Sequence, residues 1–306
     1  MKTQRYRGRF APSPTGPLHI GSLVAAVASY LQARQHDGLW FLRIEDLDQP
    51  RNQSGAVDSI LRSLEAHGLL WDETPLYQSQ RWDYYQDALQ RLIDTDVLFY
   101  CTCSRKQLRE LASQSGIYPG RCRARKIAPK NRQSALRLQV PEQDIEFLDA
   151  VMGLQCQNLA RDVGDFVVRR ADQIYAYQLA VVVDDEWQNI SEVVRGADLL
   201  DNTARQIYLQ RLLGLNQPDY FHVPLVLSAA GEKLSKQTGA QALDDRCAVD
   251  NLLRCMIFLG QPFEPQLLSE IGSLEEFWQW AIAVWNPALI PKHANWPDEL
   301  IIHSSL

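Results

Sequence analysis

RFAPSPTGPLHIGSLVAAVASYLQARQHDGLWFLRIED, residues 9–46, carries the clearest structural pattern in the chain. Residues 8–12 predict a short strand that ends in a proline-rich turn, and apolar residues then recur on one helix face over residues 22–35. Residues 39–44 are almost all apolar, which is typical of a parallel strand covered on both faces. This order predicts a βαβ unit, whose binding edge lies at the carboxyl ends of its strands.

The rest of the chain predicts an α/β protein interrupted by an insertion. Helices are expected at residues 55–70, 80–98, 177–187 and 203–213, and strands at residues 190–194 and 221–227. Between Tyr100 and about Leu154 the apolar pattern breaks, apart from short strand-like pieces such as residues 135–140. From Asp244 onward the tail is expected to be helical, with Trp278, Trp280 and Trp285 in the core.

The composition bounds the class of protein. A chain of 306 residues suggests about two domains at roughly 150 residues each. The first residues lack the apolar core of a signal peptide, and no run approaches the roughly 18 apolar residues of a membrane span. We therefore expect a cytoplasmic protein that does not bind membranes. In that compartment the six cysteines, at positions 101, 103, 122, 156, 247 and 255, are thiols or metal ligands.

Charge is distributed unevenly along the chain. The net charge is −6, yet residues 104–137 contain one acid, Glu110, and many basic side chains. The basic residues are Arg105, Lys106, Arg109, Arg121, Arg123, Arg125, Lys126, Lys130, Arg132 and Arg137. A local field of this kind attracts phosphates whatever the net charge, although a solvated basic loop explains the run equally well.

Two short segments together fit the binding of a polyphosphate. The first, HIGS at residues 19–22, lies where the first strand turns into the first helix, and the N–H groups and dipole of a helix start favour an anion. The second, GEKLSKQTG at residues 231–239, offers Lys233 and Lys236 on a loop that can close over phosphates. Each segment alone is more often an ordinary surface feature, but the pair in this order indicates a nucleotide site.

These segments resemble the HIGH and KMSKS signatures of the class I aminoacyl-tRNA synthetases. Five separated stretches look like the glutamyl-tRNA synthetase branch, in that family's order: RFAPSPTGPLHIGS, LRIEDLDQPR, YQLAVVVDD, VVRGADLLDNTARQIYLQRLLG and KLSKQ. The resemblance covers about residues 5–240. Ser22 stands where the first signature has its second histidine, so His19 alone can serve as the imidazole donor.

The resemblance implies a class I synthetase fold of the α/β class. A Rossmann-like parallel sheet would form in two halves, residues 1–99 and 173–240, around an inserted zinc-binding, acceptor-type α+β subdomain at residues 100–172. Residues 241–306 would form a small helical domain similar to a stem-contact domain. Only 67 residues follow Gly239, so an anticodon-binding domain is not expected.

The resemblance to the glutamyl-tRNA synthetases also implies an ATP site and a glutamate site. His19 and the Gly21 backbone would hold ATP phosphates, and Mg²⁺ is expected with the ATP. Catalysis would also involve the loop residues Lys233, Ser235 and Lys236, with the two lysines neutralising charge on the leaving pyrophosphate. The implied glutamate-binding residues are Arg9, Ala11, Ser13, Glu45, Tyr177 and Arg195.

The charges and hydrogen-bonding groups of the implied glutamate-binding residues suit glutamate. The planar guanidinium groups of Arg9 and Arg195 can meet carboxylates, and Glu45 at a strand end can take the ammonium group. Tyr177 would add a phenol hydrogen bond. For Glu45 the alternative is an exposed strand-end acid beside Asp46 and Asp48. Glutamine would leave a guanidinium without its counter-charge, which favours glutamate as the substrate.

Three cysteines lie close together at positions 101, 103 and 122. In a reducing compartment such a cluster favours zinc, although three free thiols remain an alternative. Tyr118, four positions before Cys122, matches a Cys-x-Cys…Tyr-x3-Cys arrangement in the short glutamyl-Q-tRNA(Asp) synthetases. The fourth ligand would then be Tyr118, with Cys156 or a water as alternatives. We expect one structural zinc ion, distant from the ATP motifs.

The short tail favours the glutamyl-Q-tRNA(Asp) synthetase family. Members activate glutamate without tRNA and transfer it to the queuosine base in the anticodon of tRNA(Asp). The resemblance implies that the basic insertion and the core grip the anticodon stem-loop, and that the protein is a monomer. The alternatives are a reduced acceptor-end glutamyl-tRNA synthetase, an adenylylating enzyme with a non-tRNA acceptor, and a non-catalytic tRNA-binding paralogue.

Overall fold

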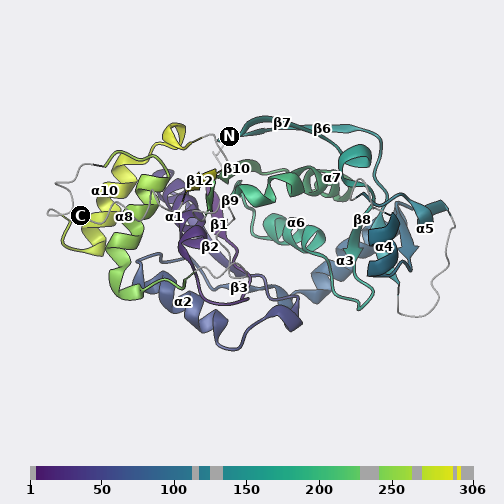
Figure 1. The fold of residues 1–306 in the computed structure, drawn as a ribbon, viewed down its shortest axis with the longest axis horizontal. Helices are drawn as coiled ribbons and strands as arrows, with labels where there is room; N and C mark the ends of the chain where they lie inside the picture. The colour runs from purple at the N-terminus through teal and green to yellow at the C-terminus, as the bar shows by residue number, and fades with distance from the viewer. Residues whose placement is uncertain are drawn as a thin grey trace.

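The first βαβ unit follows the sequence expectation closely (Figure 1). In the computed structural model, strand β1 (Arg7–Phe10) leads into helix α1 (Ile20–Gln35), and β2 (Leu39–Ile44) pairs in parallel with β1. The short strand β3 (Leu76–Tyr77) then pairs in parallel with β2. These pairings place the ends of β1 and β2 at one edge of the sheet, where the candidate site lies.

Not all of the chain is described. The structure describes residues 5–111, 117–124, 134–227, 241–263, 271–291 and 295–297. The predicted phosphate loop, with Lys233, Ser235 and Lys236, lies outside these residues, and so do Arg125, Lys126, Lys130 and Arg132. No helix of the described ranges is long and apolar enough to cross a membrane.

A second set of parallel strands continues the sheet. Strand β9 (Glu192–Gly196) pairs in parallel with β10 (Asp219–Val223), and helices α6 (Tyr177–Trp187) and α7 (Thr203–Leu213) have the predicted bounds. Strand β1 lies beside β9, because the Ser191 N–H donates to the Arg7 carbonyl at 2.9 Å. The sheet of β3, β2 and β1 therefore lies edge to edge with the sheet of β9 and β10, with a topological switch between the neighbouring strands β1 and β9. Ligands of open α/β sheets bind at such a switch.

Helices cover both faces of these strands. Trp40, Leu42 and Ile44 of β2 pack in one core with α1, whereas Phe41 faces a second core with α3 (Trp82–Asp94), α6 and α7. The alternation follows from the two-residue period of a strand. Helix α2 (Ala56–Ala66) contributes Ile60 and Leu64 to the first core. Both faces are thus buried, as the continuous apolar run in β2 predicts.

The insertion divides between two sheets. Strands β4 (Leu98–Cys101), β5 (Ala135–Leu138) and β8 (Phe166–Arg169) form an antiparallel sheet of their own, near α4 (Arg105–Leu111) and α5 (Arg121–Ala124). The hairpin of β6 (Asp144–Asp149) and β7 (Gly153–Asn158) instead joins the core, where β6 pairs in parallel with β10. Part of the segment 100–172 therefore extends the core sheet. The domain boundaries themselves remain a prediction.

The C-terminal helices pack on α1. Helices α8 (Ala248–Phe258) and α10 (Leu274–Val284) share its core, and the Trp285 indole N–H donates to the Gln32 side-chain oxygen at 2.9 Å. Trp278 and Trp285 are buried as expected, and Trp280 is half-buried. The expectation of an entirely helical tail is wrong in one place, because β12 (Asn295–Pro297) pairs with β11 (Leu225–Leu227).

Candidate functional site

A cavity of about 530 Å³ opens at the carboxyl ends of β1, β2 and β9. Eight residues predicted for the glutamate and ATP sites line it: Arg9, Ala11, Ser13, His19, Gly21, Glu45, Tyr177 and Arg195. They come from segments far apart in the chain, and the switch between β1 and β9 brings them together. The remaining predicted residues of these sites, Lys233, Ser235 and Lys236, lie outside the described residues.

The helix start at the cavity is closed by a reciprocal cap. The Ser22 N–H donates to His19 Nδ1 at 3.3 Å, and the His19 N–H donates to Ser22 Oγ at 2.8 Å. This capping box explains Ser22 at the position where the family signature has histidine. Because Nδ1 accepts a hydrogen bond, the neutral His19 ring carries its proton on Nε2. That N–H is the donor that a phosphate oxygen needs.

Of the three acids after β2, only Glu45 lines the cavity. Asp46 accepts from the Ser79 hydroxyl at 2.6 Å, and Asp48 accepts from Arg170 at 2.9 Å. Burial raises the pKa of Glu45 to about 7, against the opposing pull of Arg43 and Arg9. Glu45 therefore changes charge near neutral pH, and it ionises more fully when a cation lies against it.

Beneath the cavity, Arg9 and Arg43 share one carboxylate. Asp185 Oδ1 lies 3.1 Å from Arg9 Nε and 2.8 Å from Arg43 Nη2, and all three side chains are buried. Burial alone would raise the pKa of Asp185, but the two guanidinium groups hold it below its ordinary value. Asp185 therefore stays ionised and compensates the buried cations.

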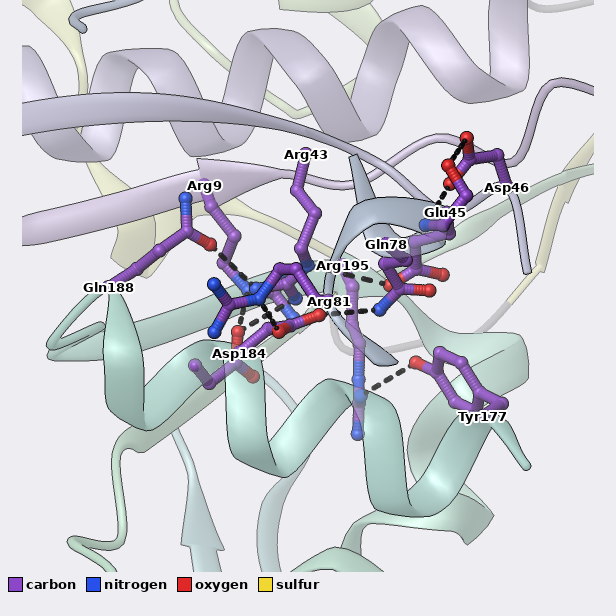
Figure 2. A network of polar contacts seen from close by, with 12 residues as sticks. Arg9, Arg43, Glu45, Asp46, Gln78, Arg81, Tyr177, Asp184, Gln188 and Arg195 are labelled. Atoms are coloured by element: carbon purple, nitrogen blue, oxygen red, sulfur yellow. Dashed lines mark hydrogen bonds and ion pairs between the residues drawn. The ribbon is translucent and has the colours of Figure 1, made fainter. Parts of the chain in front are cut away.

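Arg195 is held by uncharged acceptors. Its Nε donates to His222 Nε2 at 2.9 Å, its Nη2 to Thr203 Oγ1 at 3.0 Å, and its Nη1 to the Tyr177 hydroxyl at 3.3 Å. Figure 2 shows the guanidinium standing beside Tyr177. Behind it, His222 Nδ1 lies 2.6 Å from Asp149 Oδ2. Burial, together with Arg195, lowers the pKa of His222.

The three clustered cysteines converge at the insertion. The sulfur atoms of Cys101, Cys103 and Cys122 all lie within 4.8 Å of one another, and the Tyr118 hydroxyl lies 3.8 Å from Cys101 Sγ. A hydrogen bond from the Cys122 N–H to the same hydroxyl, at 2.7 Å, holds Tyr118 in place. Cys156 is exposed on β7 and is not part of this group. Of Tyr118 and Cys156, the structure thus brings Tyr118 to the three sulfur atoms.

The basic run contains residues with different roles. Arg137 is buried, stacks on the Tyr118 ring at 4.2 Å and donates to the Asp165 carbonyl at 2.8 Å. Arg137 therefore supports the cysteine cluster and is not available to a phosphate. Arg123 is more exposed and forms an ion pair with Asp165 at 3.2 Å. Lys106 and Arg109 lie exposed on α4.

Sequence reasoning missed four residues behind the cavity: Arg43, Asp149, Asp185 and His222. The sequence did contain an indication for Asp185. Two consecutive acids follow the apolar run AVVV on one helix, and acids that become buried there require partners of opposite charge or hydrogen-bond donors. Asp149 and His222 had none, because their contact spans 73 positions and depends on the pairing of β6 with β10.

Comparison with known proteins shows to which family the chain belongs. The class I tRNA synthetases (E and Q), catalytic domain, match residues 5–260. A glutamyl-Q tRNA(Asp) synthetase of Dechloromonas aromatica is 52% identical over 94% of this chain and 97% of its own length. Another from Pseudomonas paraeruginosa is 50% identical over 97% of this chain and 99% of its own length.

The chain belongs to the glutamyl-Q tRNA(Asp) synthetases. As a class I tRNA synthetase it is a ligase. Among solved structures, a glutamate tRNA ligase of Elizabethkingia meningosepticum in complex with its amino acid superposes with a TM-score of 0.80 at 25% identity. That match covers 97% of this chain and 68% of the longer ligase. The class I synthetase fold with its Rossmann-like parallel sheet, implied by the sequence resemblance, is confirmed.

Proposed function

We propose that this enzyme activates L-glutamate with ATP in the absence of tRNA and transfers the glutamate to the queuosine base in the anticodon of tRNA(Asp). The observation that carries the proposal is the cavity at the switch between β1 and β9, lined by Arg9, Arg195 and Glu45. Two relatives of about half-identical sequence bear the name glutamyl-Q tRNA(Asp) synthetase, which supports the same acceptor here.

The amino-acid half of the cavity suits glutamate. Arg195 offers a cation to the side-chain carboxylate, Glu45 offers an anion to the ammonium group, and Tyr177 adds a hydroxyl. Arg9 adds positive charge toward the second carboxylate. Ala11 and Ser13 line the wall between β1 and α1. A neutral side-chain amide in place of the carboxylate would leave the guanidinium charge unanswered in a buried site.

The nucleotide half lies at the start of α1. His19 and the Gly21 backbone would hold phosphates of ATP, and Mg²⁺ would accompany the ATP as its counter-ion. An oxygen of the α-carboxylate attacks the α-phosphorus, the bond to the bridging oxygen breaks, and pyrophosphate leaves. This step needs positioning and charge stabilisation more than a protein nucleophile. Lys233, Ser235 and Lys236 would supply that stabilisation from the KLSKQ loop.

Charging of tRNA(Asp) that lacks its 3′-terminal adenosine tests the acceptor. Removal of this nucleotide takes away the 3′ acceptor and leaves queuosine intact, and the control is full-length tRNA(Asp) from the same preparation. We expect radiolabelled glutamate to be incorporated into both, because the acceptor lies in the anticodon. Loss of incorporation in the shortened tRNA would instead identify an acceptor-end glutamyl-tRNA synthetase. That alternative draws support from the similarity to the glutamate tRNA ligases.

ATP–pyrophosphate exchange tests activation separately. We expect exchange that depends on glutamate and needs no tRNA. Silence with every amino acid would favour a non-catalytic tRNA-binding paralogue, and exchange without tRNA transfer would favour another acceptor. The proposed grip on the anticodon stem-loop by exposed basic residues such as Lys106 and Arg109 predicts that affinity for tRNA(Asp) falls steeply with salt.

We also propose that Cys101, Cys103, Cys122 and Tyr118 hold one structural zinc ion. Zinc–sulfur bonds of about 2.3 Å in a tetrahedral site separate sulfur atoms by roughly 3.8 Å. The three sulfur atoms lie within 4.8 Å, with Cys103 and Cys122 3.4 Å apart, so the donor set fits. The ion would fasten β4 to α5 and take no part in the reaction.

Metal analysis of the purified protein tests this site. We expect about one zinc per chain, and Cys103→Ser to lose the metal and lower the melting temperature. The matched control is Cys156→Ser, whose thiol is exposed on β7 outside the cluster. Equal zinc content in the wild type and Cys103→Ser would contradict the assignment.

A further inference from the structure

Asp149 and His222 lie behind Arg195 and do not line the cavity. We propose that they form a positioning pair, which fixes the guanidinium of Arg195 for the substrate carboxylate. The proposal rests on the function proposed above, because it assigns Arg195 to glutamate. It adds two positioning residues, one of which the inserted hairpin delivers to the core.

The strand register sets the three residues in a row. His222 on β10 faces Arg195 on β9 in the parallel pairing, and Asp149 at the end of β6 faces the neighbouring Tyr220. Arg195 Nε donates to His222 Nε2 at 2.9 Å, and His222 Nδ1 lies 2.6 Å from Asp149 Oδ2. The exposed fractions of Arg195, His222 and Asp149 are 5%, 0% and 1%. Water therefore does not compete for these hydrogen bonds.

The hydrogen bonds define one tautomer of His222. Arg195 can only donate, so His222 Nε2 must present its lone pair and the ring proton must lie on Nδ1. Nδ1–H then donates to Asp149, which stays ionised. Burial opposes this ionisation, but the hydrogen bonds from His222 and the Met152 N–H hold the pKa of Asp149 below its ordinary value. A second proton on His222 would lie on Nε2, so two N–H groups would face each other and the hydrogen bond from Arg195 Nε would be lost.

Asp149 is itself fixed by the hairpin turn. Its Oδ1 accepts the N–H groups of Val151 at 3.1 Å, Met152 at 2.8 Å and His222 at 3.3 Å. Oδ2 is thereby left to the imidazole. One chain of hydrogen bonds thus runs from the hairpin turn through the Asp149 carboxylate and the His222 ring to the Arg195 guanidinium at the cavity. Arg195 keeps a fixed orientation in it, and no carboxylate of the described residues makes an ion pair that would neutralise its charge.

Two substitutions of His222 separate the two hydrogen bonds of the ring. In His222→Gln the amide oxygen reaches the position of Nε2, so it can still accept from Arg195. In His222→Asn the shorter amide reaches only the position of Nδ1, so it can donate to Asp149 but leaves Arg195 Nε unpaired. We expect His222→Asn to raise the glutamate KM about tenfold or more in ATP–pyrophosphate exchange, with the glutamate KM of His222→Gln within about threefold of wild type.

Asp149→Asn tests the tautomer itself. The three backbone N–H groups will hold the oxygen of the introduced amide, so its NH₂ group will face His222 Nδ1. That contact forces the ring proton onto Nε2, against Arg195, and we expect the glutamate KM to rise about tenfold. In the double variant Asp149→Asn, His222→Gln no ring remains to change tautomer. Its glutamate KM should therefore match that of His222→Gln alone.

Equal KM values for ATP in all variants distinguish positioning from general damage, and melting temperatures check folding. The proposal is overturned if His222→Gln and His222→Asn raise the glutamate KM equally, if Asp149→Asn leaves it unchanged, or if the ATP KM rises in parallel. Either Asp149→Asn or His222→Asn suffices should the other not fold. A wild type without glutamate-dependent exchange refutes the proposed function, whereas an active wild type with unaffected variants refutes only the positioning pair.

Discussion

Arg9 and Arg195 line the same cavity but are held by different kinds of partner. Arg9 makes a buried ion pair with Asp185, which also compensates Arg43. Within the described residues Arg195 makes no ion pair, and its acceptors are His222, Thr203, Tyr177 and the Leu199 carbonyl. One guanidinium thus lies against a shared carboxylate, and the other is oriented by neutral groups.

This difference in partners distinguishes an arginine that stabilises the fold from an arginine that binds the substrate. A buried cation with a carboxylate in contact has most of its field cancelled locally, whereas one held by dipoles keeps its attraction for an incoming anion. We therefore infer that Arg195 is the main partner of the substrate carboxylate. Arg9, with Arg43 and Asp185, chiefly holds β1, β2 and α6 together.

The largest expected effect belongs to Asp185→Asn. Loss of the carboxylate charge leaves Arg9 buried without its counter-ion and Arg43 with only the Glu45 carboxylate, 3.8 Å away, so we expect the free energy of unfolding to fall by about 3 kcal/mol. Urea unfolding measures this change. Asp172→Asn is the matched control, since its carboxylate is half exposed in an ion pair with Arg170 and should change stability by less than about 1 kcal/mol. Similar losses for both would remove the distinction between the two arginines.

Arg195→Gln should have the next largest effect. Loss of the cation opposite a buried carboxylate should raise the glutamate KM about 100-fold in ATP–pyrophosphate exchange, with little change in the ATP KM. Arg9→Gln is the comparison variant, and we expect a smaller rise in the glutamate KM but a clear loss of stability. A larger rise in the glutamate KM for Arg9→Gln than for Arg195→Gln would reverse the assignment.

The main helices and strands and the residues that line the cavity could be predicted from the sequence, whereas the partners that hold those residues from behind could not. The apolar run of β2 and the patterns of α6 and α7 fix their bounds, because burial on defined faces leaves a local periodicity. Resemblance adds Arg9, Glu45 and Arg195, which lie at or next to the carboxyl ends of parallel strands, where binding residues gather.

Partners of these residues depend on strand order and register, which local sequence does not record. Nothing near Asp149 indicates that its hairpin joins β10, since the alternating pattern of β6 suits any sheet edge. His222 lies in an apolar strand and is indistinguishable there from any buried histidine. The hydrogen bond between them becomes visible only when β6, β10 and β9 are placed side by side.

The pH dependence of glutamate binding should be the third effect. With a pKa near 7, Glu45 is protonated below neutral pH and must lose that proton to bind an ammonium group. The glutamate KM should therefore fall as pH rises, by about tenfold between about pH 6 and pH 8. Glu45→Gln should show a higher KM that is flat over this range. A persistent slope in Glu45→Gln would assign the titration to another group.

Tyr177→Phe should have the smallest effect of the series. The Tyr177 hydroxyl accepts from Arg195 Nη1 at 3.3 Å, a long hydrogen bond that is one of four to this guanidinium. Because burial raises the pKa of Tyr177, the hydroxyl stays neutral throughout the working range and its loss removes a dipole, not a charge. We expect the glutamate KM to rise about threefold, measured beside Tyr208→Phe, whose hydroxyl bonds an exposed carbonyl away from the cavity. A rise of about tenfold or more would mean that the phenol contacts the substrate directly, and the orientation of Arg195 would then depend on His222, Thr203 and the Leu199 carbonyl.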